Sequence, residues 1–247
     1  MSVITGPTTI TGIDLYASTA EKLHELGQLV QSNDGRKFRY VRAGGVNLVT
    51  GDLMQEPAED TNYRSMVVQA ASAIGVRTVA VTLGGTAVTA NQFVDGDLAV
   101  EFSTGLGQNF KILSHTIQTS TTGTCTFTVD RPVAIALTTS SQVSVRKNSY
   151  DGVITFPTTP TGAPLGVAVV VIDTTEYGWI QSGGDVSVLF DTATNTQADQ
   201  VAIGPSETVA GSVSQIEAAD VAPSHIGWSR EIVSVDSTHG FAKLTID

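Results

Sequence analysis

Apolar positions are densest in residues 164–190, PLGVAVVVIDTTEYGWIQSGGDVSVLF. The nearly unbroken run from Val167 to Ile172 favours a strand that is buried on both faces. The alternation VSVLF at residues 186–190 favours a strand with one core face and one solvent face. The pair Gly183-Gly184 predicts a turn before that second strand. We therefore expect three strands here, at the centre of a small antiparallel barrel or sandwich.

The rest of the chain alternates short apolar segments with turn signals, a spacing typical of a sandwich or barrel. The clearest hairpin lies at Asn33-Asp34-Gly35, because an Asp-Gly step readily adopts the positive φ of a tight turn. Further strands are expected at Leu29–Val30, Phe38–Tyr40, Val46–Val49, Leu53–Met54, Val67–Val68, Thr78–Leu83, Gln92–Val94, Leu98–Phe102, Phe110–Leu113, Thr124–Val129, Val133–Leu137, Val143–Val145, Val201–Ile203, Val209–Val213, Ile226–Trp228, Ile232–Val235 and Phe241–Ile246.

One short helix is predicted at residues 18–27, where Ser18 and Glu21 have capping-box spacing and Gly27 provides a stop. The Thr/Gly/Ile-rich residues 1–17 predict an arm that becomes ordered on a partner surface. The Thr/Pro/Gly segment 158–164 predicts a linker. The expected fold is all-β, with two small antiparallel barrels or sandwiches. Its parts are an arm with the helix (1–27), a first β domain (28–157), the linker (158–164) and a second barrel or sandwich (165–247).

Composition narrows the function. Charged residues make up 15% of the chain, with 13 Lys and Arg against 24 Asp and Glu and a net charge of −11. An acidic surface repels phosphate, so we expect no direct binding of nucleic acid. The single Cys125 excludes an intramolecular disulfide and a cysteine-based zinc site. We see no secretion signal and no apolar run of ~18 residues, and expect a protein made in a cytoplasm without a membrane span.

Candidate chemical sites are few. The histidines His24, His115, His225 and His239 are too far apart in sequence to form a ligand pair. Asp95-Gly96-Asp97 lacks the further oxygen ligands of a calcium loop and predicts a hairpin turn. Ser114-His115 and Ser224-His225 are adjacent pairs, which point to opposite faces of a strand and cannot form a catalytic dyad there. We therefore expect no enzyme, and no catalytic, cofactor-binding or metal-binding residues.

The two tryptophans, Trp179 and Trp228, offer two interpretations. Together they could form an aromatic platform for a sugar. Both lie beside strand glycines, which let an indole pack on the backbone, so we favour a core position for each. Tyr16 and Tyr63 fall on the expected arm and on an expected loop, where aromatic anchors are useful at interfaces.

The order of several motifs resembles the head decoration, or capsid cement, proteins of tailed bacteriophages. The motifs are LGQLVQSNDGRKFRYVRAGG (26–45), TGDL (50–53), TAVTANQFVDGDLAV (86–100), GLGQNFKI (105–112), VDRPVAIAL (129–137), KNSYDGVI (147–154), PLGVAVVVI (164–172), YGWIQSGGDVSVL (177–189) and HIGW (225–228).

The resemblance implies a non-enzymatic virion protein on the outer capsid surface, bound to the major capsid protein. It also implies a homo-oligomer, with a trimer favoured, that braces neighbouring capsomers. We expect the arm at residues 1–17 to add a strand to a capsid sheet edge. The alternative is a phage tail or fibre module, or a cell-surface glycan-binding β module, and such a module should expose a tryptophan cleft.

Overall fold

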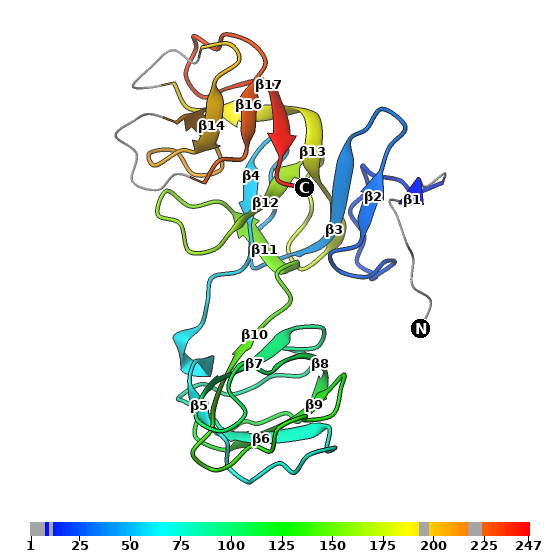
Figure 1. Cartoon of the computed structure of the whole chain (residues 1–247). Helices are drawn as coiled ribbons and strands as arrows, with labels where there is room; N and C mark the ends of the chain where they lie inside the picture. The colour runs from blue at the N-terminus through cyan, green and yellow to red at the C-terminus, as the bar shows by residue number, and fades with distance from the viewer. Residues whose placement is uncertain (1–7, 10–11, 193–197, 217–223) are drawn as a thin grey trace. The chain divides into compact units, whose positions relative to one another are not determined.

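The computed structural model describes residues 8–9, 12–192, 198–216 and 224–247 (Figure 1). These residues form an eleven-stranded sheet and a six-stranded sheet, and their only helical element is the 3-10 turn η1 (Thr61–Tyr63). The expected all-β fold is confirmed. In the described part of the chain, no helix has both the length and the apolar character needed to span a membrane.

The chain divides into two compact units, and the boundaries differ from those expected. Unit 1 combines residues 1–58 with residues 150–247, and unit 2 is residues 59–149. Unit 1 contains β1 (Thr8–Thr9), β2 (Leu29–Gln31), β3 (Lys37–Ala43), β4 (Leu53–Gln55), β11 (Asp151–Thr155), β12 (Pro164–Ala168), β13 (Tyr177–Phe190), β14 (Ala202–Pro205), β15 (Val213–Gln215), β16 (Gly227–Ser229) and β17 (Thr238–Thr245). Unit 2 contains η1, β5 (Met66–Val67), β6 (Thr78–Thr82), β7 (Asp97–Phe102), β8 (Asn109–His115), β9 (Thr124–Val129) and β10 (Gln142–Arg146).

Unit 2 is therefore an insertion between β4 and β11, which are paired neighbours with Gln55 opposite Ile154. The expected linker at residues 158–164 lies inside unit 1. Its composition does produce a loop, but the loop packs on β4. The Gln55 side chain donates a 2.7 Å hydrogen bond to Thr161, and the Ala163 amide donates to Glu56 at 3.1 Å. These contacts hold the segment against the barrel.

Unit 1 consists of two closed rings of strands that share β13. The first half of β13 pairs with β3 and β12, and the ring β3–β11–β4–β12–β13 closes on itself. The second half pairs with β17 and β15, which closes the ring β13–β17–β16–β14–β15. We call these rings the first and second barrels. A single strand of 14 residues thus belongs to both.

The expected turn at Gly183-Gly184 is wrong, because β13 runs straight through it. Gly183 pairs with Lys37 of β3 and with Thr245 of β17, so it marks the crossing between the barrels. The register against β3 shifts between Gln181 and Gly183, which is a bulge. Gly184 adopts a φ of +85°, a value that glycine tolerates and other residues rarely adopt.

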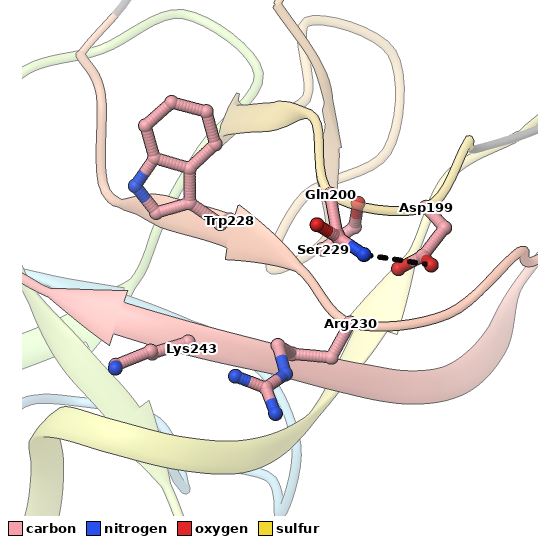
Figure 2. Close-up of a pocket in the computed structure, with 6 residues that line it drawn as sticks. All are labelled: Asp199, Gln200, Trp228, Ser229, Arg230 and Lys243. Atoms are coloured by element: carbon pink, nitrogen blue, oxygen red, sulfur yellow. Dashed lines mark hydrogen bonds between the residues drawn. The ribbon is translucent and has the colours of Figure 1, made fainter.

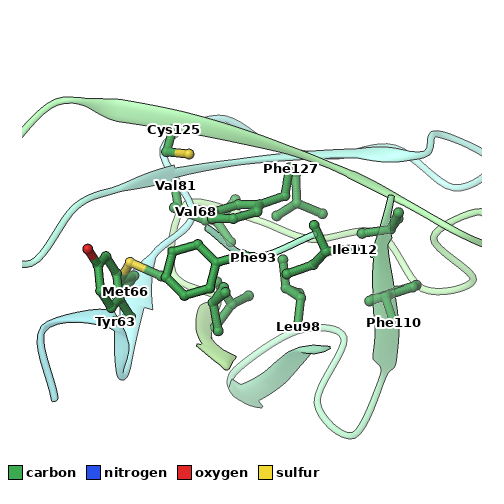
Figure 3. Close-up of a cluster of buried hydrophobic side chains, with 14 of the residues drawn as sticks. Tyr63, Met66, Val68, Val81, Phe93, Leu98, Phe110, Ile112, Cys125 and Phe127 are labelled. Atoms are coloured by element: carbon green, nitrogen blue, oxygen red, sulfur yellow. The ribbon is translucent and has the colours of Figure 1, made fainter. Parts of the chain in front are cut away.

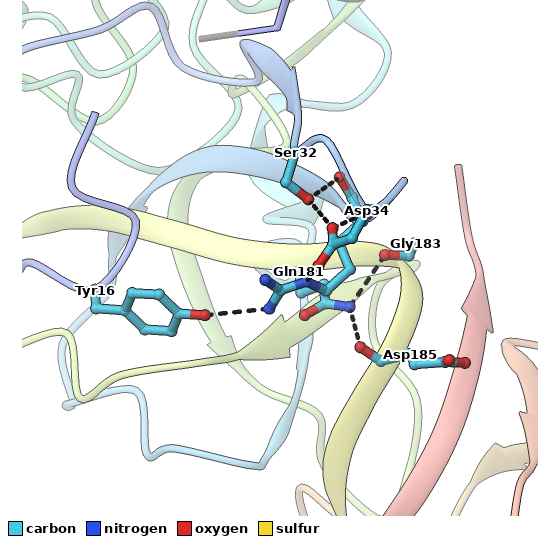
Figure 4. A network of polar contacts seen from close by, with 7 residues as sticks. Tyr16, Ser32, Asp34, Gln181, Gly183 and Asp185 are labelled. Carbon is cyan, nitrogen blue, oxygen red and sulfur yellow. Dashed lines mark hydrogen bonds and ion pairs between the residues drawn. The ribbon is translucent and has the colours of Figure 1, made fainter. Parts of the chain in front are cut away.

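Polar side chains brace this crossing (Figure 4). The buried Gln181 amide donates to the carbonyls of Gly183 at 3.1 Å and Asp185 at 2.8 Å. In the adjoining hairpin, Arg36 donates to Asp34 at 2.8 Å and to the Tyr16 hydroxyl at 3.1 Å. The Ser32 hydroxyl and the backbone and side chain of Arg36 lower the pKa of Asp34 to about 2. The predicted Asp34-Gly35 hairpin between β2 and β3 is confirmed.

Each barrel has its own apolar core, and a third cluster lies on the outer face of the first barrel. The first barrel encloses Met54, Val153, Ile172 and Ile180 among others, and the second encloses Phe156, Val188, Phe190 and Ile203 among others. The third cluster comprises Val30, Phe38, Tyr40 and Trp179. Alternation along β3 and β13 sends successive side chains to the barrel interior and to this outer cluster.

The expected helix at residues 18–27 is wrong, since this segment contains no helix. Instead, Thr19 and Tyr177 exchange backbone hydrogen bonds of 2.9 and 2.8 Å. The Ser18 hydroxyl, expected as a cap, donates to Glu176 at 2.5 Å. Tertiary hydrogen bonds therefore replace the local capping pattern. Of the expected arm, residues 1–7 and 10–11 lie outside the described residues, and Thr8–Thr9 pair in parallel with β2.

Unit 2 is a six-stranded sheet in the order β5-β10-β7-β8-β9-β6. A bridge between Val68 and Val81 joins the ends of this order, so the sheet curls into a nearly closed barrel around one core (Figure 3). The expected strand at Gln92–Val94 is a turn whose Phe93 ring packs 4.7 Å from the Tyr63 ring. The segments expected as strands at Val133–Leu137 and Ile232–Val235 contain only isolated bridges.

A candidate binding groove at Trp228

The two tryptophans have opposite environments. Trp179 is 2% exposed in the outer cluster of the first barrel, with its ring centroid 5.0 Å from that of Tyr40. Trp228 is 46% exposed on the second barrel. The expected core position is therefore confirmed for Trp179 and wrong for Trp228. The cause is strand parity, because β16 buries Gly227 and Ser229 and must turn the residue between them outward.

Trp228 stands over an open groove of about 570 Å³ on the second barrel (Figure 2). Its lining combines one indole with charged and polar side chains: Asp199, Gln200, Trp228, Ser229, Arg230 and Lys243. Trp228 and Lys243 are direct partners across β16 and β17. Asp185 of β13 is the next partner of Lys243, so the three residues form one outward-facing row across three strands.

Ser229 anchors the loop segment that lines one part of the groove. Its buried hydroxyl donates to the Ala198 carbonyl at 2.6 Å and accepts from the Val201 amide at 3.1 Å. The Gln200 amide donates to the Ser229 carbonyl at 3.2 Å. These bonds fix residues 198–201 beside β16. The exposed His225 ring packs against the indole in a T-shaped arrangement, with centroids 5.3 Å apart, which limits the orientations of Trp228.

The cations of the groove are weakly neutralised. Arg230 Nη1 lies 3.9 Å from Asp185 Oδ1, at the outer limit of an ion pair, and both side chains are at least half exposed. Within the described ranges, no carboxylate lies within ion-pairing distance of the Lys243 ammonium. Gln200 donates a long 3.4 Å hydrogen bond to Asp199. The groove therefore presents two cations and the Asp199 carboxylate around an indole, and the Asp185 carboxylate lies beside it, 3.9 Å from Arg230.

The other candidate residues from the sequence lie apart. His24 packs against Trp179, with ring centroids 5.2 Å apart. His115 accepts a 3.1 Å hydrogen bond from the Phe93 amide in unit 2, and His239 lies beside Thr50 in unit 1. Asp97 pairs with Lys111 at 2.8 Å. Burial raises the pKa of the Cys125 thiol in the unit 2 core. Over the described ranges, no three His, Cys, Asp or Glu side chains are grouped to hold a metal ion.

The sequence reasoning missed Asp199, Gln200, Arg230 and Lys243. One signal was present, since Phe241 and Lys243 alternate with the apolar Ala242 and Leu244, and this pattern gives β17 an outward face. Comparison with protein-family models, curated proteins and solved structures finds no match to this chain. The groove must therefore be interpreted from its own chemistry.

Proposed function

We propose that this chain is a non-enzymatic structural protein of a tailed-phage virion, which binds the outer face of the capsid and braces neighbouring capsomers. The motif order supports this proposal, as does an exposed apolar patch on unit 2. The patch, which we call the unit 2 patch, consists of Ile74, Leu106 and Ile135, exposed by 69%, 64% and 52%. Large exposed aliphatic side chains that lie together are typical of sites that another protein covers.

Backbone pairing brings these three side chains together. Ser72 is bridged to Leu137, and the Gly75 amide donates to the Val133 carbonyl at 2.9 Å, so Ile74 and Ile135 lie opposite each other. The Gln108 side chain donates to the Ile135 carbonyl at 2.9 Å, which places the loop carrying Leu106 alongside. We propose that this patch contacts the major capsid protein.

Bracing a shell requires contacts with more than one capsomer. A homo-oligomer, with a trimer favoured, would present several copies of the patch. Once one copy is bound, the next binds at a high effective concentration, so weak contacts add up to firm attachment. In this proposal the segment 1–17 adds a strand to a capsid sheet edge.

The test uses heads of the phage that encodes this chain, prepared without it, and measures occupancy by co-sedimentation and electron microscopy. We expect Ile74→Ser combined with Leu106→Ser to weaken binding about tenfold or more, since each removes buried apolar area. Ile232→Ser, which removes an equally exposed side chain from unit 1, is the matched control. Unchanged occupancy by the folded double variant would rule out the patch.

A separate variant tests the segment 1–17. Deletion of residues 2–12 should abolish head occupancy and leave the free protein folded, as judged by circular dichroism. Light scattering of the free protein measures the oligomer, and a monomer at all concentrations would contradict the trimer.

A further inference from the structure

We propose that the Trp228 groove binds an acidic saccharide, a sugar ring that carries a carboxylate. The ring would stack on Trp228, and its carboxylate would lie between Lys243 and Arg230. This inference concerns unit 1 and does not rest on capsid binding by unit 2.

The polarity of the lining defines the class of ligand. At about 570 Å³ the groove falls within the usual range for small-molecule sites. Most such sites are lined mainly by apolar side chains, whereas here Trp228 is the one apolar residue among six. A peptide anchor would need apolar walls on several sides. A pyranose has one face of C–H groups and an edge of hydroxyls, which matches one indole surrounded by polar groups.

The indole is presented for stacking. Trp228 projects from a strand whose two flanking residues are buried, so its backbone is fixed by the barrel. The His225 ring packs against the indole, and Trp228 as a whole is 46% exposed. Trp loses little conformational entropy on binding because only two side-chain torsions rotate. A sugar ring placed on this surface would displace water from an apolar face without rearrangement.

Charge then selects the kind of sugar. Lys243 is the direct cross-strand neighbour of Trp228, and such partners have Cβ atoms about 5 Å apart. Arg230 follows Trp228 by two residues, with Ser229 between them buried, and both Trp228 and Arg230 are exposed. Two cations lie beside one indole in a chain whose net charge is −11, and their one neighbouring acid across the strands, Asp185, pairs with Arg230 only at 3.9 Å, so the cations can still attract an anion. The planar guanidinium can bind both oxygens of a carboxylate.

Asp199 and Gln200 account for the remaining lining. A carboxylate and an amide are suited to accepting and donating hydrogen bonds with vicinal hydroxyls. A bare phosphate or sulfate would leave the indole unused and would offer no vicinal hydroxyls to Asp199 and Gln200. A carboxylated sugar uses the indole, the cations and the hydroxyl-binding pair together.

The experiment is a fluorescence titration of the whole chain with oligogalacturonate, and with its methyl ester, which keeps the hydroxyls and removes the charge. Trp179 is buried and provides a constant background. We expect saturable quenching by the acid and about tenfold weaker binding of the ester. Trp228→Ala should abolish binding, and Trp228→Phe should retain part of it when followed by calorimetry. Lys243→Gln and Arg230→Gln should each weaken binding about tenfold, with unchanged circular dichroism.

Lys147→Gln, which removes an exposed lysine charge from unit 2, is the matched control and should bind like the wild type. Three results would overturn the proposal. One is equal binding of acid and ester. Another is equally tight binding of tetraglutamate, which would indicate an acidic peptide site. The third is the absence of a saturable response to oligogalacturonate, alginate fragments and sialyllactose alike.

Discussion

Gly184 of β13 lies directly against the backbone of Arg36, so that a Cβ placed on Gly184 would approach the Arg36 Cα to 3.0 Å. The contact occurs where β13 leaves the first barrel and enters the second. Both the positive φ and the close approach require glycine here. The junction of the two barrels therefore depends on a residue without a side chain.

Gly184→Ala should destabilise the protein by about 2–3 kcal/mol, because it adds backbone strain to a steric contact. Gly35→Ala is the control, because Gly35 has a φ of +89° and open space around it. Gly35→Ala should lower the free energy of unfolding by about 1 kcal/mol, because it adds backbone strain without a steric contact. Urea unfolding measures both. Equal losses in the two variants would show that the contact with Arg36 is unimportant.

Unit 2 should fold on its own when residues 59–149 are produced as a separate chain. It has its own core, and its two ends connect to strands that are paired neighbours, an arrangement that tolerates insertion. We expect dispersed amide resonances and cooperative thermal unfolding. Unit 1, with residues 59–149 replaced by a short Gly/Ser linker, should fold as well. An unfolded spectrum for isolated unit 2 would contradict this expectation.

Asp52→Asn should stabilise the protein at neutral pH. Burial raises the pKa of Asp52, and a nearby His239 offsets this in part. A raised pKa means that the folded state binds the proton more tightly, so stability falls as the pH rises above the ordinary carboxyl range. The neutral amide removes this penalty, and because the side chain is partly exposed and screened by solvent we expect a small gain, of at most about 0.5 kcal/mol, at pH 7.

The gain from Asp52→Asn should vanish below the ordinary pKa of 3.8, where the wild-type carboxyl is protonated. Urea unfolding at several pH values checks both points. Glu207→Gln, at an exposed position, is the control and should leave stability unchanged. A loss of stability in Asp52→Asn at pH 7 would show that the charge is needed.

Asp247→Asn should destabilise the protein by about 1 kcal/mol at neutral pH. Arg39 Nε and Nη2 lie 2.8 and 2.7 Å from the two carboxylate oxygens, and this pair lowers the pKa of Asp247. A lowered pKa contributes stability that is complete above the ordinary pKa of 3.8 and is lost as the pH falls through the folded-state value.

The wild type and the Asp247→Asn variant should therefore converge in acid. Unfolding midpoints measured from pH 7 down to acid test this convergence. Arg39 keeps its 2.8 Å hydrogen bond to the Gly27 carbonyl in the variant, so the comparison isolates the ion pair. A constant difference at all pH values would show that the carboxylate acts through packing alone.

Local patterns in the sequence predicted many of the strands, but they failed at Val46–Val49, Gln92–Val94, Val133–Leu137 and Ile232–Val235. The segment Thr124–Val129 coincides with β9, and the Asp34-Gly35 turn sets the register of β2 and β3. Alternating apolar residues and a turn glycine are local properties, so they can be recognised without the fold. The pair Gly183-Gly184 was wrongly interpreted as a turn, because glycine suits both a tight turn and a close crossing of strands. Which of the two forms depends on the contact with Arg36, which is far away in sequence.

The groove was harder to predict for a related reason. β16 has three residues, too few for its alternation to show which side faces the core. The outward position of Trp228 is set by pairing with Ala202 of β14 and Lys243 of β17, and neither contact is visible locally. The insertion was missed because the Thr/Pro/Gly segment 158–164 looks like a linker, whereas the junctions of unit 2 have the polar composition of ordinary surface loops.

The insertion of unit 2 also determines the order in which the two units can fold during translation. Strands β3 and β4 leave the ribosome early, but the first barrel cannot close until β11, β12 and β13 have followed. All of residues 59–149 must be translated in between, which takes on the order of ten seconds at ~5–20 residues per second. During that interval unit 2 can finish folding while the edges of β3 and β4 wait unpaired. The nascent chain is most exposed to wrong strand partners in this interval.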